Sequence, residues 1–300
     1  MSLPGGRLRI VFIGTVEFSL LALEQCLRLG AEVVGVITRA VSPVNADFAD
    51  LTGVAEGAGI PCLHTAAVNG EEAMEWIASR RPDIIFCFGW SALIGEKLLT
   101  LPPMGVLGFH PAALPRNRGR HPLIWALALG LDRTASSFFF MDQGADSGDI
   151  LSQREVEIRY EDDARALYDR VAATALEQIT EFLPGLMAGT FTRTPQDHSL
   201  ANVWRKRSAA DGCIDFRMPS RGVYNLVRAL ARPYVGAHAE WAGRECKIWK
   251  AAEADGMPAN LEPGKVLAVS GEAITVKCGD GAIVLLEHDL QPLPQEGEYL

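Results

Sequence analysis

Short apolar runs alternate with amphipathic segments through the first half of the chain, and this alternation constrains its fold more than any other feature. Apolar runs with the composition of buried strands occupy residues 9–14, 32–38, 59–63, 83–88, 105–109 and 135–141. Segments with helical spacing occupy residues 16–29, 50–57, 71–81, 95–99, 123–129 and 162–186. Strands that alternate with helices at this spacing predict an α/β fold, in which helices cover both faces of a parallel sheet.

The last hundred residues have a different pattern. Short apolar and β-branched runs are separated there by Gly, Pro and Asp, at 246–250, 264–269, 273–278 and 282–286. They predict a small antiparallel β-domain. A polar stretch from Phe191 to Arg207 separates the two patterns and predicts a linker. We therefore expect a first domain at 1–190, a linker at 191–207 and a second domain at 208–300.

Composition narrows the class of protein and its compartment. With 300 residues, 48% of them hydrophobic and 22% charged, the chain is long enough for two cores. No run approaches the roughly 18 to 20 apolar residues of a membrane helix, and the N-terminus runs into a strand without a signal peptide. Six isolated cysteines favour buried thiols in a reducing cytoplasm, and no Cys-x-x-Cys or histidine cluster suggests a metal.

The net charge of −9 argues against nucleic acid as a bulk electrostatic partner. The charge is uneven, however. Residues 205–250 contain ten Arg and Lys against four acidic residues, whereas residues 251–300 contain two Lys against nine acidic residues. This distribution weakens a role in RNA binding without excluding it.

The expected sheet directs attention to the ends of its strands, because ligands of such sheets bind beyond the carboxyl ends. The first strand is followed by Gly14-Thr-Val-Glu-Phe18 and not by Gly-x-Gly-x-x-Gly, which argues against a dinucleotide-dependent oxidoreductase. His110, the Gly89-Trp90 turn and the loop around Asp146 all follow predicted strands. They therefore belong at one edge of the sheet.

His110 begins the most informative stretch of the chain, which continues to Trp125. About one helix and one strand later, Asp146 lies between Gly144 and Gly148. Histidine titrates near neutral pH, and a nearby carboxylate can orient the ring and favour its cation, as proton transfer requires. Taken singly, the histidine could be an exposed turn residue and the aspartate an Asx-turn residue. Their combination favours a catalytic pair.

Two segments are similar to the hallmark motifs of the folate-dependent formyltransferases, His110-Pro-Ala-Ala-Leu-Pro-Arg-Asn-Arg-Gly119 and Met141-Asp-Gln-Gly-Ala-Asp-Ser-Gly-Asp-Ile150. Residues 11–18 resemble the family's first strand and turn, and residues 279–286 resemble its C-terminal β-domain, so the resemblance covers nearly the whole chain. It implies a Rossmann-like catalytic domain with a doubly wound, mostly parallel sheet, and a small open β-barrel of OB-like type. It also implies transfer of the formyl group of N10-formyltetrahydrofolate to an amine, without a metal.

The resemblance further implies roles for individual residues. His110 would contact the reacting formyl group, and Asp146 would pair with it. The residues expected to bind the folate are Phe88, Gly89, Trp90, Leu93, Ile94, Asp142 and Gly144. The residues expected to bind the acceptor are Gly14, Thr15 and Arg120, the last because its counterpart in sugar-nucleotide enzymes faces a diphosphate. A solvated basic loop is the alternative for Arg120, and core packing is the alternative for Trp90.

Gly108 departs from the family, most members of which have Asn two residues before the catalytic histidine. That amide stabilises the oxyanion, and loss of one such donor typically costs about 10²–10³ in rate. Asn117 and His121 could replace it, as could a backbone N–H or a bound water, although His121 could also be a surface residue at a helix start. Otherwise the activity is weak or absent, and the chain is a non-catalytic folate-binding relative.

Two amine acceptors suit a chain of this size, a nucleotide-linked amino sugar and the methionine of initiator tRNA. The tRNA enzymes carry a long basic loop after the second strand, whereas the matching residues 39–50 contain one Arg and two Asp. Phosphate contacts, which dominate RNA affinity, are therefore missing there. Arg118-Gly-Arg120 and residues 203–216 resemble the sugar-modifying branch, which we favour. A glycinamide ribonucleotide enzyme would lack the second domain. The sugar, the nucleotide and the oligomeric state stay open, with a homodimer as one option.

Overall fold

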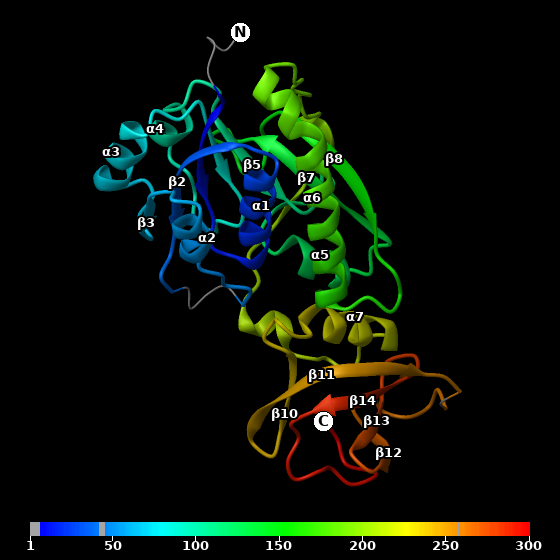
Figure 1. Ribbon diagram of the computed structural model, residues 1–300. Helices are drawn as coiled ribbons and strands as arrows, with labels where there is room; N and C mark the ends of the chain where they lie inside the picture. The colour runs from blue at the N-terminus through cyan, green and yellow to red at the C-terminus, as the bar shows by residue number, and fades with distance from the viewer. Residues whose placement is uncertain (1–6, 42–45, 257) are drawn as a thin grey trace. The chain divides into compact units, whose positions relative to one another are not determined.

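The computed structural model describes residues 7–41, 46–256 and 258–300. The chain forms two compact units and passes between them more than once (Figure 1). The first unit comprises the chain up to Gly119, Ala135–Val156 and Arg170–Val203, and the second comprises Arg120–Thr134, Glu157–Asp169 and Trp204–Leu300. The domain boundaries expected at 190 and 207 stay a prediction. Within the described ranges, no helix is both long and apolar enough to cross a membrane.

A seven-stranded sheet forms the centre of the first unit, in the order β3-β2-β1-β4-β5-β7-β8. Its strands are β1 (Arg9–Ile13), β2 (Glu32–Thr38), β3 (Cys62–His64), β4 (Ile84–Cys87), β5 (Val106–His110), β7 (Arg133–Phe140) and β8 (Ile150–Glu157). The five strands from β3 to β5 pair in parallel. The predicted doubly wound, mostly parallel sheet is therefore confirmed.

Strand β7 is an exception, because it runs antiparallel to β5, with Phe109 opposite Phe138. Because of this strand, the sheet is mostly and not entirely parallel. Parallel neighbours need a crossover connection, which is usually a helix packed on the sheet. The helix between β5 and β7 is α5 (Pro122–Ala128), and it belongs to the second unit.

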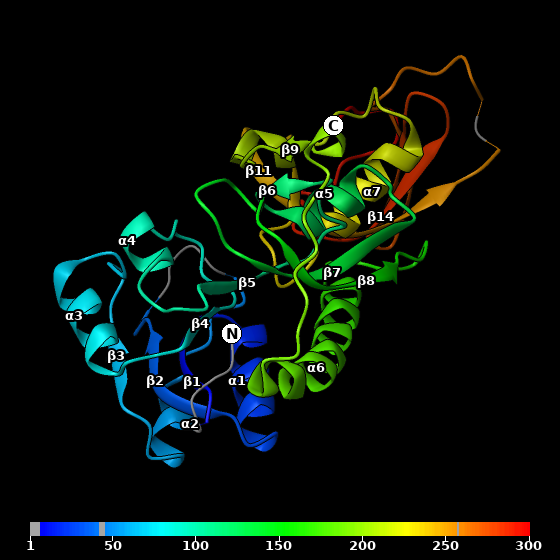
Figure 2. The ribbon, with the colours of Figure 1, turned by 90° about the horizontal axis from the view of Figure 1, so that it is seen from above.

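Helices lie on both sides of the first-unit sheet (Figure 2). Helices α1 (Glu17–Arg28) and α6 (Ala164–Ala188) lie side by side, and Gln25 Nε2 donates to Thr180 Oγ1 at 2.7 Å. Helix α3 (Glu71–Ser79) packs Trp76 against Gly35 of β2, where an added Cβ would lie 2.7 Å from the ring. The shorter helices are α2 (Thr52–Gly57) and α4 (Glu96–Leu99).

The core explains why successive residues of the central strands β1 and β4 are apolar. Phe12, Phe86 and Phe138 pack around Phe88, with ring centroids 5.2 to 5.5 Å from it. The residues that alternate with them along the same strands pack into a separate cluster, which includes Val11, Ile13, Ile85 and Cys87. Strands buried on both faces lose the period-two pattern of half-buried strands. Because these strands are buried, the packing of the core fixes the position of their carboxyl ends.

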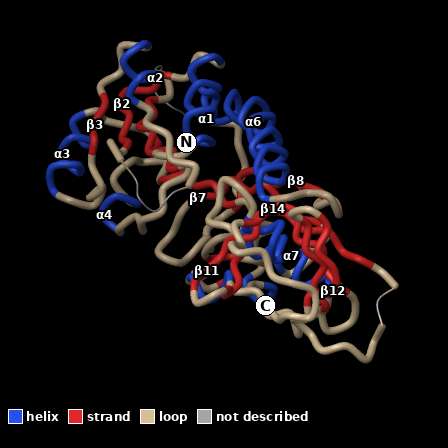
Figure 3. The backbone as a smooth tube through the Cα atoms, turned by 90° about the horizontal axis from the view of Figure 1, so that it is seen from below, coloured by secondary structure: helices blue, strands red, loops and turns tan. Residues whose placement is uncertain are grey.

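An antiparallel sheet forms the second unit, in the order β10-β11-β14-β13-β12. Its strands are β10 (Ala237–Trp241), β11 (Arg244–Ala254), β12 (Val266–Ser270), β13 (Ala273–Lys277) and β14 (Ala282–His288). The predicted antiparallel arrangement is confirmed. The sequence pattern does not predict β10 or α7 (Ser220–Leu230), the helix that packs against α5 and β11 (Figure 3).

The stretch expected to be a linker makes regular hydrogen bonds. Thr194 and Ile150 exchange two backbone hydrogen bonds of 2.8 and 2.9 Å. The carbonyl oxygen of Asn202 accepts from the Arg118 N–H at 3.1 Å, and β9 (Val203–Trp204) pairs with β6 (Arg118–Gly119). This stretch therefore has fixed partners in the protein.

Candidate functional site

His110 is the last residue of β5 and lies at the carboxyl edge of the first-unit sheet. Its side chain is buried, with 5% of the residue exposed. Nε2 lies 2.8 Å from the carbonyl oxygen of Asn117, and Nδ1 lies 3.6 Å from Oδ2 of Asp146. The structure thus brings together the two residues that the sequence predicts as a pair, and their catalytic role stays a prediction.

The two neighbours determine how the imidazole of His110 is protonated. A carbonyl oxygen can only accept, so Nε2 carries a proton and donates it to Asn117. The other ring nitrogen, Nδ1, faces the Asp146 carboxylate. At 3.6 Å the groups form an ion pair when Nδ1 is protonated, but they are too far apart for a direct hydrogen bond. This ring is suited to accept a proton from a substrate.

Asp146 is held through both its side chain and its backbone. Its φ of 52° lies in the left-handed region, which is uncommon for a residue with a side chain. Oδ2 accepts from the Gly119 N–H at 2.8 Å. Gln196 Nε2 donates to the carbonyl oxygens of Asp146 and Gly148, at 2.9 and 2.7 Å. These bonds keep the carboxylate directed at the imidazole.

The two glycines of this loop are needed for space. A Cβ at Gly144 would lie 2.0 Å from Ser147 Oγ, and a Cβ at Gly148 would lie 1.8 Å from the Phe140 carbonyl oxygen. Asp142 stabilises the same loop, because its Oδ1 accepts from the Gly144 N–H at 3.0 Å and from Ser147 Oγ at 2.6 Å. Asp142 and Gly144 therefore have structural roles in the loop, and their contact with folate stays a prediction.

Three polar residues support the pair, and the sequence motifs include only Arg118 among them. Arg118 is buried, and its Nε and Nη2 donate to Gln196 Oε1 at 3.2 and 2.6 Å, which fixes the orientation of the amide. Asn202 Oδ1 accepts from the Asn117 N–H at 2.8 Å and so holds the turn whose carbonyl binds the imidazole. The only sequence signal for Gln196 and Asn202 is that they are amide side chains in a polar stretch. Both are positioning residues, because they act on the pair through other groups.

Gly108, where the resembling family has Asn, is closely packed on its Cβ side. An added Cβ would lie 2.6 Å from Met141 Cε and 3.2 Å from Phe139 Cε1. These two side chains therefore fill the space in which a side chain at position 108 would begin. An oxyanion donor in this chain has to come from another residue.

Asn117 and His121, the candidates for that donor, differ in their placement. Asn117 has a φ of 63° and holds the His110 ring through its carbonyl. His121 precedes α5 in the second unit and has a φ of 55°. Burial lowers the pKa of His121, and the charges of Arg120 and Arg207 lower it further, so the ring is neutral at pH 7. Its buried Nδ1 has no hydrogen-bond partner within the described part of the chain.

Arg120 is exposed and forms a basic cluster of the second unit with Arg205, Lys206 and Arg207. The guanidinium groups of Arg205 and Arg207 lie 5.3 and 4.5 Å from the ring centroid of Trp125. Asp211 pairs with Arg205. The cluster supplies positive charge to a chain whose net charge is −9.

The residues expected to bind folate differ in exposure. Phe88 is fully buried, and its ring belongs to the aromatic core. Gly89 has a φ of 69°, and an added Cβ would lie 2.2 Å from a side chain of the turn after β1. Trp90 and Ile94 are half-buried, whereas Leu93 is 83% exposed. The last three leave apolar surface that a flat ring can cover.

Gly14 and Thr15 form the turn after β1. A Cβ at Gly14 would lie 2.6 Å from the Phe88 carbonyl oxygen. Ser19 Oγ accepts from the Thr15 N–H at 3.2 Å and donates to the same carbonyl at 2.6 Å. Thr15 is fully buried, and its hydroxyl has no partner among the residues that the structure describes. Gly14 is therefore a packing position, whereas Thr15 retains hydrogen-bonding capacity.

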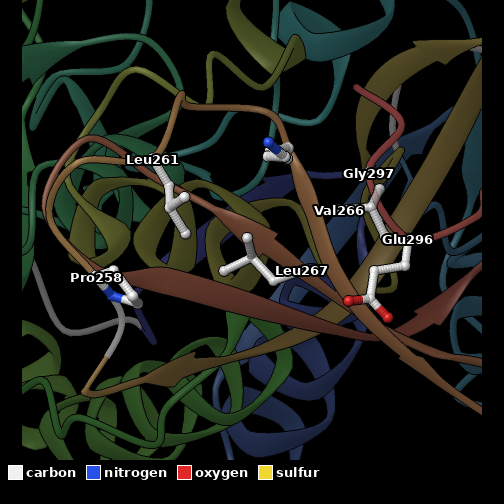
Figure 4. A pocket seen from close by; sticks show the side chains of 7 residues that line it. Pro258, Leu261, Val266, Leu267, Glu296 and Gly297 are labelled. Carbon is white, nitrogen blue, oxygen red and sulfur yellow. The ribbon is translucent and has the colours of Figure 1, made fainter.

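Two cavities of about 590 and 570 Å³ lie in the second unit. The first is lined by Pro258, Leu261, Lys265, Val266, Leu267, Glu296 and Gly297 (Figure 4). The second is lined by residues 210, 213–217, 263, 264 and 300. Neither contains a residue of the predicted site. Over residues 7–41, 46–256 and 258–300, no three potential metal-ligating side chains come together.

Comparison with known proteins identifies the family. Residues 8–183 match the family described as formyl transferase, and residues 206–294 match the formyl transferase C-terminal domain. A methionyl-tRNA formyltransferase of Geobacter sulfurreducens is 33% identical over 288 residues, which cover 95% of this chain and 90% of that protein.

Solved structures share the fold at lower identity. The sugar 3N-formyl transferase WlaRD, solved with dTDP and 5-N-formyl-THF, is 16% identical, with a TM-score of 0.70 over 93% of this chain and 97% of its own. HypX of Aquifex aeolicus in complex with tetrahydrofolic acid is 21% identical, with a TM-score of 0.66 over 93% of this chain and 44% of its own. On the family and sequence matches, this chain belongs to the formyl transferase family, whose members are folate-dependent N-formyltransferases.

Proposed function

We propose that this protein transfers the formyl group of N10-formyltetrahydrofolate to the amino group of a nucleotide-linked amino sugar. The observation that carries the chemistry is the buried His110, with Nε2 fixed by a carbonyl and Nδ1 facing Asp146 at 3.6 Å. Two observations favour a sugar nucleotide. Arg120 is exposed, and residues 39–50, which follow β2, contain only one Arg and two Asp.

Formyl transfer requires a neutral amine, a stabilised oxyanion and a base. The amine nitrogen forms a bond to the formyl carbon, and the bond from that carbon to N10 of the folate then breaks, while the amine loses a proton. His110 Nδ1 accepts this proton, directly or through water, and Asp146 stabilises the imidazolium that results. N10 of the folate takes up a proton as it leaves.

The oxyanion donor is the part of this mechanism that differs from the family pattern. The space beside Gly108 is filled by Met141, so we propose Asn117 or His121 as the donor. The neutral state of His121 at pH 7 suits it to hydrogen-bond donation from one ring nitrogen. A backbone N–H or a water remains the alternative, and a non-catalytic folate-binding protein is the outcome if no donor exists.

The residues after β4 suit a pteridine, which is flat and carries donors and acceptors on its edges. Leu93 and Ile94 offer apolar surface, and Trp90 is half-buried. Apolar surface of this kind suits the face of a flat ring. We therefore assign the folate to this turn and to the Asp146 loop, where Asp142 and Gly144 lie.

Initiator tRNA is the second candidate acceptor, favoured by the 33% identity with a methionyl-tRNA formyltransferase. The basic cluster at Arg205, Lys206 and Arg207 would also suit a phosphate backbone. Against it stands the stretch 39–50, which contains one Arg and two Asp and would offer little attraction to RNA. Residues 42–45 of that stretch lie outside the described residues.

The decisive experiment supplies N10-formyltetrahydrofolate with dTDP-, UDP- and GDP-linked amino sugars and, separately, with Met-tRNA. We expect product from at least one sugar nucleotide and none from Met-tRNA. Robust formylation of Met-tRNA with a steep salt dependence would overturn the sugar assignment. Folate binding without formyl transfer to any amine would indicate the non-catalytic relative.

A further inference from the structure

Three buried polar atoms without hydrogen-bond partners lie at the carboxyl ends of three neighbouring strands. They are Thr15 Oγ1 after β1, Arg39 Nε after β2 and Trp90 Nε1 after β4, and none has a partner among the described residues. Buried polar groups are nearly always hydrogen-bonded, so such a group in a folded protein calls for an explanation. A bound ligand is one explanation when several of these atoms share one edge of a sheet.

The strand register brings these three residues together. β1 lies between β2 and β4, and Ile13 of β1 is the partner of Ile37 on one side and Cys87 on the other. The guanidinium of Arg39 lies 4.5 Å from the ring centroid of Trp90. It therefore reaches across the end of β1, where the fully buried Thr15 follows.

Thr15, Arg39 and Trp90 form one corner of the sheet edge, and the chemistry of their side chains favours the binding of an anionic oxygen. The side chains of Arg39 and Trp90 can only donate hydrogen bonds, and the hydroxyl of Thr15 can also donate. Nε of Arg39 has no hydrogen-bond partner in the part of the chain that the structure describes, and the sequence at 42–45 contains no acidic residue. A neutral carbonyl edge would satisfy the donors but would leave the charge of Arg39 without a counterpart.

A second arginine and tryptophan pair shows that stacking alone does not make a site. Arg80 lies 4.6 Å from the ring centroid of Trp76, and its Nε also lacks a partner within the described ranges. The carbonyl oxygen of Arg80 accepts from Arg9 Nη2, at the start of β1 and thus at the amino edge of the sheet. Ligands of parallel sheets bind at the opposite edge. Of the two pairs, Arg39 and Trp90 lie at that edge, where Thr15 follows the intervening strand β1.

We propose that Thr15, Arg39 and Trp90 bind an anionic oxygen group, a phosphate or a carboxylate, of one of the two substrates. This proposal rests on the proposed function for the two sources of that group, a phosphate of the nucleotide-linked acceptor and a carboxylate of the folate glutamate. Arg39 supplies the charge, Trp90 the platform and a second donor, and Thr15 a third donor at the end of β1. The bound anion completes the hydrogen bonding of the corner.

The test measures binding without turnover, so it stands even if no amine acceptor is found. Equilibrium binding of inorganic pyrophosphate and of folinic acid is measured for the wild type, Arg39→Met, Thr15→Val and the control Arg80→Met. Loss of a charge-assisted hydrogen bond corresponds to roughly a 10- to 150-fold weaker binding. We expect Arg39→Met to weaken one probe by about that factor and Thr15→Val to weaken the same probe less, while Arg80→Met changes neither.

The probe that is affected identifies the source of the anion. Weaker pyrophosphate binding with unchanged folinic acid binding assigns the corner to the phosphate of the acceptor, and the reverse assigns it to the carboxylate of the folate. Thermal unfolding of each variant checks that Arg39→Met and Arg80→Met are folded to a similar extent. Binding of both probes within twofold of the wild type in folded Arg39→Met and Thr15→Val would overturn the proposal.

Discussion

Two corners of the same sheet edge differ in how completely their polar groups are satisfied. At the end of β5, both nitrogens of His110 face a defined group, and Asp146 is held by an N–H and by Gln196. At the ends of β1, β2 and β4, by contrast, Thr15, Arg39 and Trp90 each keep a buried polar atom without a partner in the described part of the chain.

We infer from this difference that the first corner carries out the chemistry and that the second corner binds substrate. Catalytic side chains need a fixed geometry, because displacement of such a group can slow the reaction by about 100-fold. Binding groups can remain unpaired until a ligand arrives, at the expense of some stability. We therefore expect substitutions at the first corner to change kcat and substitutions at the second corner to change binding.

Removal of the carboxylate charge should have the largest effect at the first corner. Asp146→Asn keeps an oxygen that can accept from the Gly119 N–H but no longer stabilises a charged imidazole. General acid–base catalysis contributes about 10²–10⁴ in rate, and we expect kcat to fall within that range. Asp280 similarly accepts from the Ser220 N–H, at 2.7 Å in the second unit, so Asp280→Asn is the matched control. A near-normal kcat for Asp146→Asn would remove the pair from the mechanism.

Gln196→Glu should have the next largest effect. A carboxylate at this position keeps an acceptor for Arg118 but loses the N–H donors to the Asp146 and Gly148 carbonyls. We expect kcat to fall by about 10- to 100-fold with little change in KM, because the geometry of the pair loosens. Gln178, whose buried amide donates to the Ser136 carbonyl, provides the control Gln178→Glu. Equal losses of kcat in both variants would indicate a general effect on folding.

Asn202 offers a test by conservative rescue. Its Oδ1 accepts from the Asn117 N–H, a contact that Asp can also make and Ala cannot. One hydrogen bond contributes about 0.5–1.5 kcal/mol, so Asn202→Ala should lower kcat by roughly 2- to 12-fold. Asn202→Asp should retain most of the activity. Comparable kcat values for the Ala and Asp variants would show that this bond does not position His110.

Gly108→Asn should have the smallest effect on kcat, because it changes the stability of the protein more than the chemistry of the site. The new Cβ would meet Met141 Cε at 2.6 Å, and overpacking typically costs about 1–3 kcal/mol. We expect a lower Tm and no gain in kcat for the single variant. The pair Gly108→Asn with Met141→Ala should recover part of the Tm. A higher kcat for the single variant would mean that Met141 moves aside and that the oxyanion position is unfilled.

The sequence predicts the first unit well where physical burial dominates. Strands β1, β2, β4 and β5 are buried on both faces, so their continuous apolar runs are informative. The direction of β7 could not be predicted, because it depends on where α5 packs. Helix α7 escapes the pattern because its buried face includes Asn225 and Arg228, and Arg228 donates to the backbone carbonyl of Asp162.

The sequence predicts that His110 and Asp146 form a pair in the candidate site, but it does not predict the residues that hold them. His110 and Asp146 lie in recognisable motifs next to glycines and strand ends. Gln196 and Asn202 lie in a polar stretch whose composition predicts a linker, and their function depends on backbone contacts that have no sequence period. The unpaired atoms of Arg39 and Trp90 likewise become visible only when the register brings β2 and β4 to either side of β1.

The most direct measurement compares His110→Ala with Arg39→Met for kcat and for equilibrium binding of both substrates. We expect His110→Ala to lower kcat by about 10²–10⁴ with near-normal binding. We expect Arg39→Met to weaken binding of one substrate by roughly 10- to 150-fold with kcat little changed. His64→Ala, which removes an imidazole 3.6 Å from Asp50, should leave both quantities unchanged. If His110→Ala alters only binding, or if Arg39→Met alters only kcat, the assignment of chemistry to the first corner and of binding to the second is contradicted.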